Sequence, residues 1–377
     1  MPEQSKPLRV LLAGGGTAGH INPAIAIADT IKKYDPRAEI LFIGTPKGME
    51  NRLVTQAGYT IVPVDVQGFQ RKISVENIKR NASAAVKLMS AGRKANTIVK
   101  KFKPDLAIGT GGYVSGPAIR ACQKAGVKTA IHEQNAWPGV TTKLLAPKAD
   151  CVMLAVEEAE VRLKTEAPVE ITGNPVRAEF FAYSKEEARQ KLGVGDEPVI
   201  LSYGGSLGAR RINESMAEVI AQLLRSGRFR FVHAYGSYGS FMPGLLAEKG
   251  VDLDSSLLHL SEYIDNMALW MTAADLIVSR SGAITLSEIQ VCGKASILIP
   301  SPNVAENHQY HNAKVLADKD AAVLIEEADL TGEGLTQTVS QLFEEKDRLL
   351  VLAENCKKTA VLNTNERIYA VLKKLIP

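Results

Sequence analysis

Cysteines, aromatic residues and long hydrophobic runs are all scarce in this sequence. Of its 377 residues, four are cysteines and 6% are aromatic. The cysteines are far apart and show none of the paired spacings of zinc sites or redox pairs, so we expect reduced, structural thiols at Cys122, Cys151, Cys292 and Cys356. No apolar run approaches the roughly 18 residues that a spanning helix needs, and no signal peptide can be drawn. These absences exclude a transmembrane protein and favour one that stays in the cytoplasm.

Acidic residues are nearly missing from one segment of the chain. The net charge is only +4, yet the stretch from Gln67 to Lys103 holds ten basic residues against a single acid, Glu76. Such a segment favours anionic partners, either phosphorylated substrates or a negatively charged membrane surface. Nucleic acid is not expected as a partner, because the segment has few aromatic residues and no recognition motif.

The same segment carries an apolar pattern from Ile73 to Met89. Its apolar residues recur at the spacing of one helical face, at Ile78, Ala82, Ala85 and Met89. Two interpretations remain open. The segment is either a solvated basic helix packed on its own domain, or a surface that touches anionic lipid by combining charge with apolar insertion.

The length suits two globular domains, and the order of predicted elements indicates which kind. A strand over 9–13 runs into the glycine-rich loop 14–19, and we expect the next helix to begin near Asn22 and Pro23. Much later in the chain, another strand over 198–203 runs into a second glycine-rich loop, 204–210. Further strands are predicted at 39–44, 105–109, 128–131, 230–234, 274–279 and 295–300. Strands that alternate with helices indicate parallel sheets covered on both faces, so the fold class is α/β with two doubly wound domains in tandem.

The glycine-rich loops predict where a ligand binds. Ligands of open parallel sheets bind at the carboxyl ends of the strands, where helix N-termini offer free N–H groups to phosphates. Gly14, Gly16 and Gly19 also satisfy the dinucleotide fingerprint. That fingerprint needs an acid at the end of the next strand, which is predicted over 39–44, but Glu39 stands at the beginning of that strand. A diphosphate ligand other than a dinucleotide is therefore favoured.

Some residues near these loops have chemistry that fits a transfer reaction. His20 follows the first loop, where a neutral imidazole is able to take a proton from a substrate hydroxyl or merely order the loop. Glu288, six residues after Gly282, either binds two sugar hydroxyls or is a surface glutamate favoured near a helix start. His308 and His311 have no evident third ligand, so no metal site is expected there. Asp252 and Asp254 are interpreted as part of a solvated turn.

Seven motifs, in order between residues 14 and 310, resemble the MurG family of N-acetylglucosaminyltransferases, which complete the lipid-linked disaccharide of peptidoglycan. The motifs are Gly14 to Pro23, Gly111 to Pro117, His132 to Asn135, Gly173 to Arg177, Gly204 to Arg210, Ser279 to Glu288 and Glu306 to Tyr310. Ala18 replaces a frequent glycine of the family, and His308 stands where some members have glutamine. Neither difference removes a charged or nucleophilic group.

The resemblance implies the GT-B architecture, in which two Rossmann-like domains face a cleft. It places an acceptor- and membrane-facing domain over 1–174, with a C-terminal helix at about 358–377 returning to it, and a domain that binds UDP-N-acetylglucosamine over 175–357. The implied acceptor is lipid I, undecaprenyl-diphospho-N-acetylmuramoyl-pentapeptide. The protein would then lie peripherally on the cytoplasmic face of the cell membrane, with proteins of cell-wall synthesis and division as partners. No cofactor and no metal are implied.

The resemblance also implies site residues. Arg177 and Ser206 would contact the uridine diphosphate, the backbone of Ile264 would read uracil, and Glu288 would bind the ribose hydroxyls. Gly111, Gly112 and Tyr113 would shape the acceptor side. The complete set implied for the donor is Thr17, Ala18, Gly19, Asn135, Arg177, Ser206, Ile264, Ala283, Ile284, Thr285, Leu286, Ser287, Glu288 and Gln309.

The implied reaction is a single inverting displacement, with His20 as the candidate base and Glu133 as a substitute. The helix N-termini and Arg177 would stabilise the departing diphosphate. Two other classes of protein stay open at this point. A non-hydrolysing UDP-N-acetylglucosamine epimerase shares the architecture but needs no basic lipid-facing surface, and a noncatalytic sugar-nucleotide sensor would bind the ligand unchanged.

Overall fold

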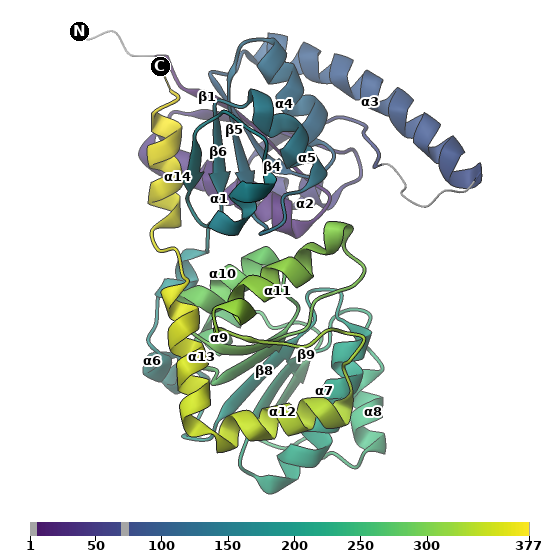
Figure 1. Ribbon diagram of the computed structural model, residues 1–377, viewed down its shortest axis with the longest axis vertical. Helices are drawn as coiled ribbons and strands as arrows, with labels where there is room; N and C mark the ends of the chain where they lie inside the picture. Colours follow the sequence, from purple (N-terminus) through teal and green to yellow (C-terminus); the bar gives the residue numbers. More distant parts are fainter. Residues whose placement is uncertain (1–5, 69–74, 377) are drawn as a thin grey trace. The chain divides into compact units, whose positions relative to one another are not determined.

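The computed structural model describes residues 6–68 and 75–376, without the side chains of 75–83, 85 and 346. Residues 69–74, which include Arg71, Lys72 and Ile73 of the basic segment, lie outside the described residues. The chain divides into two compact units (Figure 1). Unit 1 comprises Met1–Pro175 and Asn363–Pro377, and unit 2 comprises Val176–Leu362.

The described part of unit 1 is built on a seven-stranded parallel sheet with helices on both faces. The strand order is β3-β2-β1-β4-β5-β6-β7, so the chain reverses direction across the sheet between β1 and β4. The strands are β1 (Arg9–Gly14), β2 (Glu39–Gly44), β3 (Thr60–Pro63), β4 (Leu106–Gly111), β5 (Lys128–Glu133), β6 (Cys151–Leu154) and β7 (Val169–Ile171). The helices are α1 (Ala18–Tyr34), α2 (Met49–Gln56), α3 (Val75–Phe102), α4 (Ser115–Lys124), α5 (Val140–Leu145) and α14 (Thr364–Lys373).

Alternate residues of β1 supply two separate hydrophobic cores. Val10 and Leu12 pack with α1 and α14 on one face, whereas Leu11 and Ala13 pack with α3 and α4 on the other. Successive strand side chains point to opposite faces, so a strand covered on both sides must be apolar throughout. This requirement explains why the short run at 10–13 is continuously hydrophobic.

The C-terminal helix α14 belongs to unit 1, although it follows unit 2 in the sequence. Ile368 and Leu372 are buried in the core beneath α1. The ring of Tyr369 stacks on Tyr34, with 4.1 Å between the ring centroids. The end of the chain therefore contributes to the core that the first helix begins.

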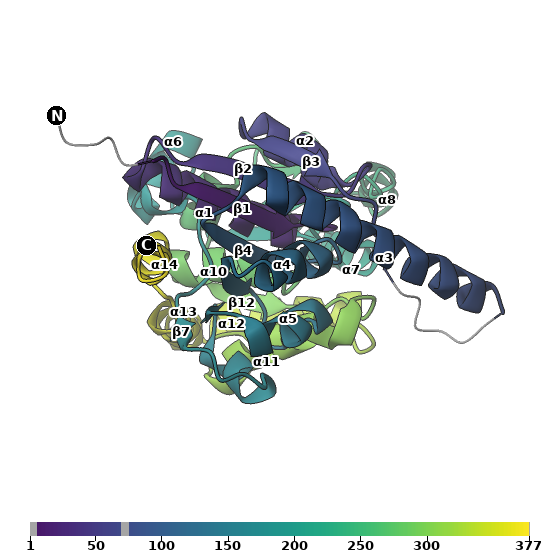
Figure 2. The ribbon, with the colours of Figure 1, turned by 90° about the horizontal axis from the view of Figure 1, so that it is seen from above.

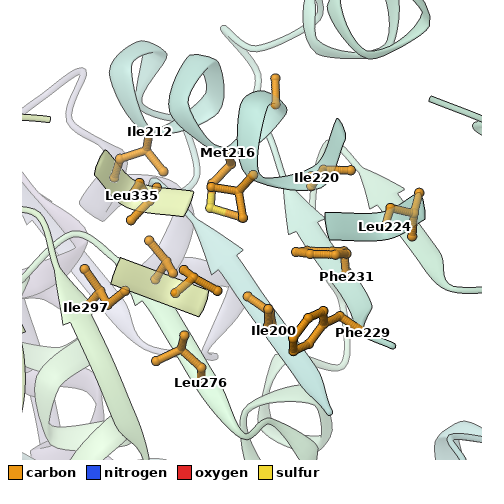
Figure 3. Packing of buried hydrophobic residues seen from close by; sticks show 14 of the residues in the cluster. Ile200, Ile212, Met216, Ile220, Leu224, Phe229, Phe231, Leu276, Ile297 and Leu335 are labelled. Carbon is orange, nitrogen blue, oxygen red and sulfur yellow. The ribbon is translucent and has the colours of Figure 1, made fainter. Parts of the chain in front are cut away.

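Unit 2 repeats the design with a six-stranded parallel sheet in its described residues, in the order β10-β9-β8-β11-β12-β13. The strands are β8 (Val199–Tyr203), β9 (Arg230–Ala234), β10 (Leu258–Ser261), β11 (Leu276–Ser279), β12 (Ala295–Leu298) and β13 (Val323–Leu324). The helices are α6 (Lys185–Leu192), α7 (Arg210–Leu223), α8 (Met242–Glu248), α9 (Met267–Ala273), α10 (Ala283–Cys292), α11 (His308–Asp318), α12 (Gly332–Glu344) and α13 (Lys346–Lys358). One of its cores brings Ile200, Leu276 and Ile297 of three strands together with Met216 of α7 (Figure 3).

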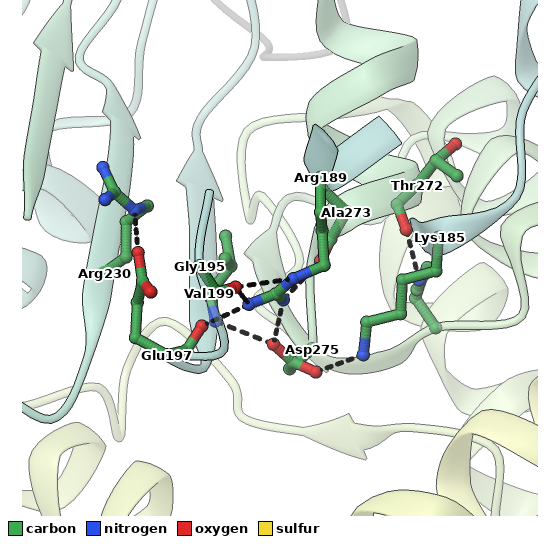
Figure 4. A network of polar contacts seen from close by, with 10 residues as sticks. Lys185, Arg189, Gly195, Glu197, Val199, Arg230, Thr272, Ala273 and Asp275 are labelled. Atoms are coloured by element: carbon green, nitrogen blue, oxygen red, sulfur yellow. Dashed lines mark hydrogen bonds and ion pairs between the residues drawn. The ribbon is translucent and has the colours of Figure 1, made fainter. Parts of the chain in front are cut away.

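Aspartates tie the amino ends of neighbouring strands together in both units. Asp275, just before β11, accepts a hydrogen bond from the backbone N–H of Val199 at 2.8 Å and pairs with Lys185 and Arg189 (Figure 4). In unit 1, Asp105 accepts from the N–H of Arg9 in the same way, also at 2.8 Å. Each carboxylate accepts a hydrogen bond from the N–H of the residue that begins the neighbouring strand. These anchors lie at the end of the sheet opposite the glycine-rich loops.

Two sequence expectations about element boundaries were wrong. Helix α1 begins at Ala18, not near Asn22, and Pro23 lies inside it. Pro23 is the sixth residue of the helix, so it lies beyond the first turn and removes the N–H that would bond to the carbonyl of Gly19. Strand β5 extends through His132 and Glu133, which were expected in a loop, and both side chains are buried. His20 consequently lies in the first turn of α1.

Helix α3 carries the described part of the basic segment. Figures 1 and 2 show its N-terminal part projecting beyond the rest of unit 1. Of the predicted apolar face, only Met89 has a described side chain, and it is 62% exposed. The side chains of Ile78, Ala82 and Ala85 lie outside the described set. No helix among the described residues is both long enough and apolar enough to cross a bilayer.

Candidate active site

The glycine-rich loops of unit 1 pack backbone against backbone. The N–H of Gly15, after β1, donates to the carbonyl of Gly111, at the end of β4, over 3.3 Å. Gly112 has a φ of +80°, and a Cβ there would lie 2.1 Å from the carbonyl oxygen of Gly15. Only glycine fits this approach. The packing leaves Thr17, Ala18 and Gly19 exposed at the N-terminus of α1, where free N–H groups favour an anion.

A buried acid, which the sequence analysis missed, holds the first loop. The carboxylate of Glu50 accepts hydrogen bonds from the backbone N–H of Thr45 at 2.8 Å, the Thr45 hydroxyl at 2.6 Å and the N–H of Gly16 at 3.3 Å. Burial by itself raises the pKa of Glu50, but these hydrogen bonds outweigh it and lower the pKa below the usual value. Glu50 therefore stays ionised and fixes the loop from behind.

His20 is half-buried and is held from several sides. Its Nδ1 lies 2.9 Å from Oε1 of Gln134, at the end of β5. The hydroxyl of Thr110 donates to the backbone carbonyl of His20 at 2.7 Å. A Cβ on Gly111 would lie 2.7 Å from Nδ1, so the imidazole packs directly on a glycine backbone. The ring is thus restrained while remaining partly accessible.

Glu133, named as a substitute base, has another task in the structure. Its buried carboxylate accepts from the N–H and side-chain amide of Asn135, at 3.1 and 3.0 Å, and from the N–H of Gly139 at 3.0 Å and the Thr142 hydroxyl at 2.5 Å. Four donors occupy its lone pairs, so it is poorly placed to remove a proton. Glu133 organises the loop that presents Asn135.

The second glycine-rich loop, in unit 2, is shaped by the same kind of contact. Gly208 has a φ of +82°, and a Cβ there would lie 2.1 Å from the carbonyl oxygen of Tyr235, after β9. The N–H of Ser237 donates to the carbonyl of Ser206 at 3.2 Å. Ser206 is exposed at the tip of this loop, just before α7. The loop is therefore braced by the neighbouring strand and open on the ligand side.

Arg177 and Glu288 meet in unit 2, although 111 positions separate them in the sequence. Arg177 Nη2 lies 3.9 Å from Glu288 Oε1, and the guanidinium also pairs with Glu179 at 2.8 Å. The side chain of Glu288 is only 14% exposed, so it is not the surface glutamate of the alternative interpretation. Burial raises its pKa to about 7, against the opposing effect of Arg177. An acid that is half ionised near neutral pH, beside an exposed arginine, is characteristic of a functional site.

The remaining donor-site candidates surround α10. Residues 283–287 form its first turn and part of its second, and Ile264 is buried near the end of β10. Gln309 accepts from the N–H of Ser301 at 2.9 Å through Oε1, and its carbonyl accepts from the Ser281 hydroxyl at 2.8 Å. Arg280, which sequence reasoning gave no role, donates to the carbonyls of Ile299 and Pro300 and pairs with Glu327. These contacts join the turns after β11 and β12.

The other polar residues singled out in the sequence make local contacts. His308 Nδ1 lies 2.8 Å from the carbonyl oxygen of Ala305. In the parts of the chain that the structure describes, no three His, Cys, Asp or Glu side chains gather as a metal would require. The N–H of Asp254 donates to Asp252 Oδ1 at 3.0 Å, which confirms the solvated turn.

Comparisons with known proteins match both units. The glycosyltransferase family 28 N-terminal domain matches residues 10–154, and the glycosyltransferase family 28 C-terminal domain matches residues 199–368. A protein of Acetivibrio thermocellus, named UDP-N-acetylglucosamine--N-acetylmuramyl-(pentapeptide) pyrophosphoryl-undecaprenol N-acetylglucosamine transferase, is 42% identical over 98% of both chains. A relative of the same name from Clostridioides difficile is 39% identical over 98% of this chain and 89% of its own.

Solved structures agree with the fold. MurG of Acinetobacter baumannii has a TM-score of 0.79 and 29% identity, with 98% of this chain and 100% of that chain covered. A UDP-GlcNAc 2-epimerase of Neisseria meningitidis has a TM-score of 0.66 at 14% identity, over 97% and 100% of the two chains, and shows a shared fold alone. Because the two domain matches cover most of the sequence and the relatives align over nearly all of it, the protein belongs to glycosyltransferase family 28.

Proposed function

We propose that this protein transfers N-acetylglucosamine from UDP-N-acetylglucosamine to the pyrophosphoryl-undecaprenol-linked N-acetylmuramyl-pentapeptide, converting lipid I to lipid II. The observation that carries the proposal is the match to relatives of that name along almost the whole chain. The basic and acidic groups expected at the site are present, including His20, Arg177 and Glu288. An epimerase is disfavoured, because two epimerase structures are only 14% and 16% identical to this chain, whereas the transferase of Acetivibrio thermocellus is 42% identical.

Unit 2 is the proposed donor-binding unit. The first turn of α10 and the loop at Ser206 offer backbone N–H groups to the diphosphate, and Arg177 supplies a positive charge. The carboxylate of Glu288 accepts hydrogen bonds from the two ribose hydroxyls. Negative charge that grows on the departing UDP is stabilised by these fixed donors. The Arg177–Glu288 ion pair supports this assignment, because it brings a phosphate-binding and a hydroxyl-binding group together.

Unit 1 is the proposed acceptor-binding unit. Gly111, Gly112 and Tyr113 shape the acceptor side, and the side chain of Tyr113 is 58% exposed. The exposed residues Thr17, Ala18 and Gly19 are assigned to the diphosphate and sugar of the donor, as the resemblance implies. His20 takes the proton of the acceptor's sugar hydroxyl as that oxygen attacks the anomeric carbon. UDP leaves in the same step, so the configuration at that carbon inverts.

A direct assay tests the overall reaction. The full chain is incubated with UDP-N-acetylglucosamine and a lipid-diphosphate N-acetylmuramyl-pentapeptide acceptor, and products are separated by mass. A lipid-linked disaccharide supports the proposal. Epimerised sugar nucleotide would make the protein an epimerase, and unchanged ligands would make it a sensor.

The base assignment is tested by His20→Ala. We expect kcat to fall by about 10² to 10⁴, while the affinity for the donor changes little because His20 itself is not among the donor-binding residues. His308→Ala is the control, since that histidine lies in unit 2, where its Nδ1 contacts the carbonyl oxygen of Ala305. A fall below tenfold would leave His20 as a loop-ordering residue.

A groove on unit 1 supports contact with a lipid surface. It has a volume of about 700 Å³ and lies among α3, α4 and α5. Its apolar lining includes two highly exposed side chains, Met89 at 62% and Leu144 at 67%. The basic residues of its lining are Arg93, Arg120 and Lys124. Apolar side chains rimmed by positive charge fit an anionic membrane surface, and we place the protein peripherally on the cytoplasmic face.

Vesicle binding tests this surface. We expect sedimentation with vesicles containing anionic lipid, release by high salt, and loss of binding in a Met89→Glu and Leu144→Glu double variant. Leu350→Glu, at a 58% exposed leucine of unit 2, is the control. Equal binding to neutral vesicles at every salt concentration would count against the electrostatic part of the proposal.

A further inference from the structure

Three polar side chains form a continuous hydrogen-bonded chain that ends at His20. His132 Nε2 lies 3.0 Å from the carbonyl oxygen of Gly173, and His132 Nδ1 lies 3.0 Å from Nε2 of Gln134. Gln134 Oε1 then lies 2.9 Å from His20 Nδ1. His132 and Gln134 are buried, whereas His20 is half-buried at the end of the chain.

A backbone carbonyl determines which ring nitrogen of His132 carries the hydrogen. The oxygen of Gly173 is able only to accept, so His132 Nε2 must carry a hydrogen and donate it. Burial lowers the pKa of His132, which keeps its ring neutral. A neutral imidazole has a single N–H. His132 Nδ1 is therefore an acceptor.

A second backbone carbonyl determines the orientation of the Gln134 amide. Its Nε2 lies 2.9 Å from the carbonyl oxygen of His132 as well as 3.0 Å from Nδ1 of that residue. Both neighbours accept, so the amide nitrogen must point toward them and the amide oxygen toward His20. Because Oε1 only accepts, Nδ1 of His20 must carry the hydrogen.

We propose that Gln134 and His132 are positioning residues that select the Nδ1–H tautomer of His20 and leave its Nε2 unprotonated, ready to take the acceptor's proton. The inference rests on the base role of His20 under the proposed function. It explains why the partner of His20 is the neutral amide of Gln134: the amide oxygen holds the hydrogen of His20 on Nδ1 without placing a charge beside the ring. It also explains the contact with Gly111, because a restrained ring keeps Nε2 aimed in one direction.

Nitrogen NMR of the full-length protein tests the proton pattern directly. Long-range ¹H–¹⁵N correlation spectra distinguish the two neutral histidine tautomers, and the His20→Gln and His132→Gln variants assign the signals. We expect Nδ1–H for His20 and Nε2–H for His132. A wild-type spectrum with the His20 hydrogen on Nε2 would overturn the proposal, whatever the variants do.

Gln134→Leu tests the consequence for catalysis. We expect His20 to become a mixture of tautomers and kcat to fall by about 10 to 10², with the KM for UDP-N-acetylglucosamine within about twofold of wild type. Gln123→Leu is the matched control, since it removes another partly buried amide of unit 1 that donates to one carbonyl. Equal kcat in the two variants would overturn the positioning role. If His20→Ala stays active while the tautomers are as expected, the base assignment fails and the proton pattern stands.

Discussion

The pKa of Glu288 predicts that donor binding strengthens as the pH rises. Burial raises this pKa from 4.5 to about 7, and only the ionised carboxylate accepts hydrogen bonds from both ribose hydroxyls. About one tenth of the carboxyl is ionised at roughly pH 6 and about nine tenths at roughly pH 8. The dissociation constant for UDP-N-acetylglucosamine should therefore fall about tenfold over this range. The donor's diphosphate is esterified at both ends and does not titrate there.

The same group should affect folding stability in the opposite direction. Its folded pKa lies above the unfolded value, so the stability it contributes is complete below about 4.5 and is lost as the pH rises through about 7. The full loss corresponds to about 3 kcal/mol. Glu288→Gln should therefore raise the melting temperature by several degrees at about pH 8, while weakening donor binding and flattening its pH dependence.

Calorimetric titration with the donor and thermal unfolding at matched ionic strength measure both effects. Glu354→Gln is the control, because Glu354 is an exposed glutamate of α13 in the same unit. The reasoning would be refuted by donor affinity that is independent of pH in the wild type. An equal pH dependence in Glu288→Gln would also refute it, because another group would then be titrating.

Two further predictions concern the supports behind the loops. Glu50→Gln should lower the free energy of unfolding by about 1–3 kcal/mol near neutral pH. Urea titrations should show that this difference between the variant and the wild type shrinks in acid. The folded pKa of Glu50 lies below 4.5, so the stability that its ionised carboxylate contributes is complete above about 4.5 and is lost as the pH falls through the folded pKa. A difference in unfolding free energy that stays the same at every pH would contradict this explanation. Asp275→Asn should cost about 2–3 kcal/mol through its ion pairs with Lys185 and Arg189, yet leave the donor dissociation constant unchanged in calorimetry. A weakened donor affinity at full stability would show that these amino-end anchors shape the site.

The strand and helix pattern could be predicted because it depends on local periodicity. The continuous apolar run at 10–13 and the glycine loops at 14–19 and 204–210 were sufficient to predict parallel sheets covered on both faces, and the structure confirms this fold class. The ends of elements were harder to predict. Helix α1 starts at Ala18, four residues before Asn22, and His20 in its first turn contacts Thr110 and Gly111 at the end of β4.

The candidate site residues were recognisable from motifs, but their tasks were not. Glu133 looks like a base in the sequence, and only the fold shows four donors surrounding its carboxylate. No role was predicted for Glu50 or Arg280 from the sequence, yet the hydrogen bonds of each residue join loops that follow different strands.

The sequence by itself determined the residue types: glycines where backbones approach closely, apolar strands that fill the cores, and His20, Arg177 and Glu288 in the loops and helix starts that follow strands. Tertiary structure decided which of these groups meet and in which protonation state. Burial and hydrogen bonding depend on residues that are distant in the chain, such as Gly173 for His132 and Arg177 for Glu288. Local pattern carries no information on those distances, so the pKa of Glu288 and the proton on His20 emerge only when the chain is folded.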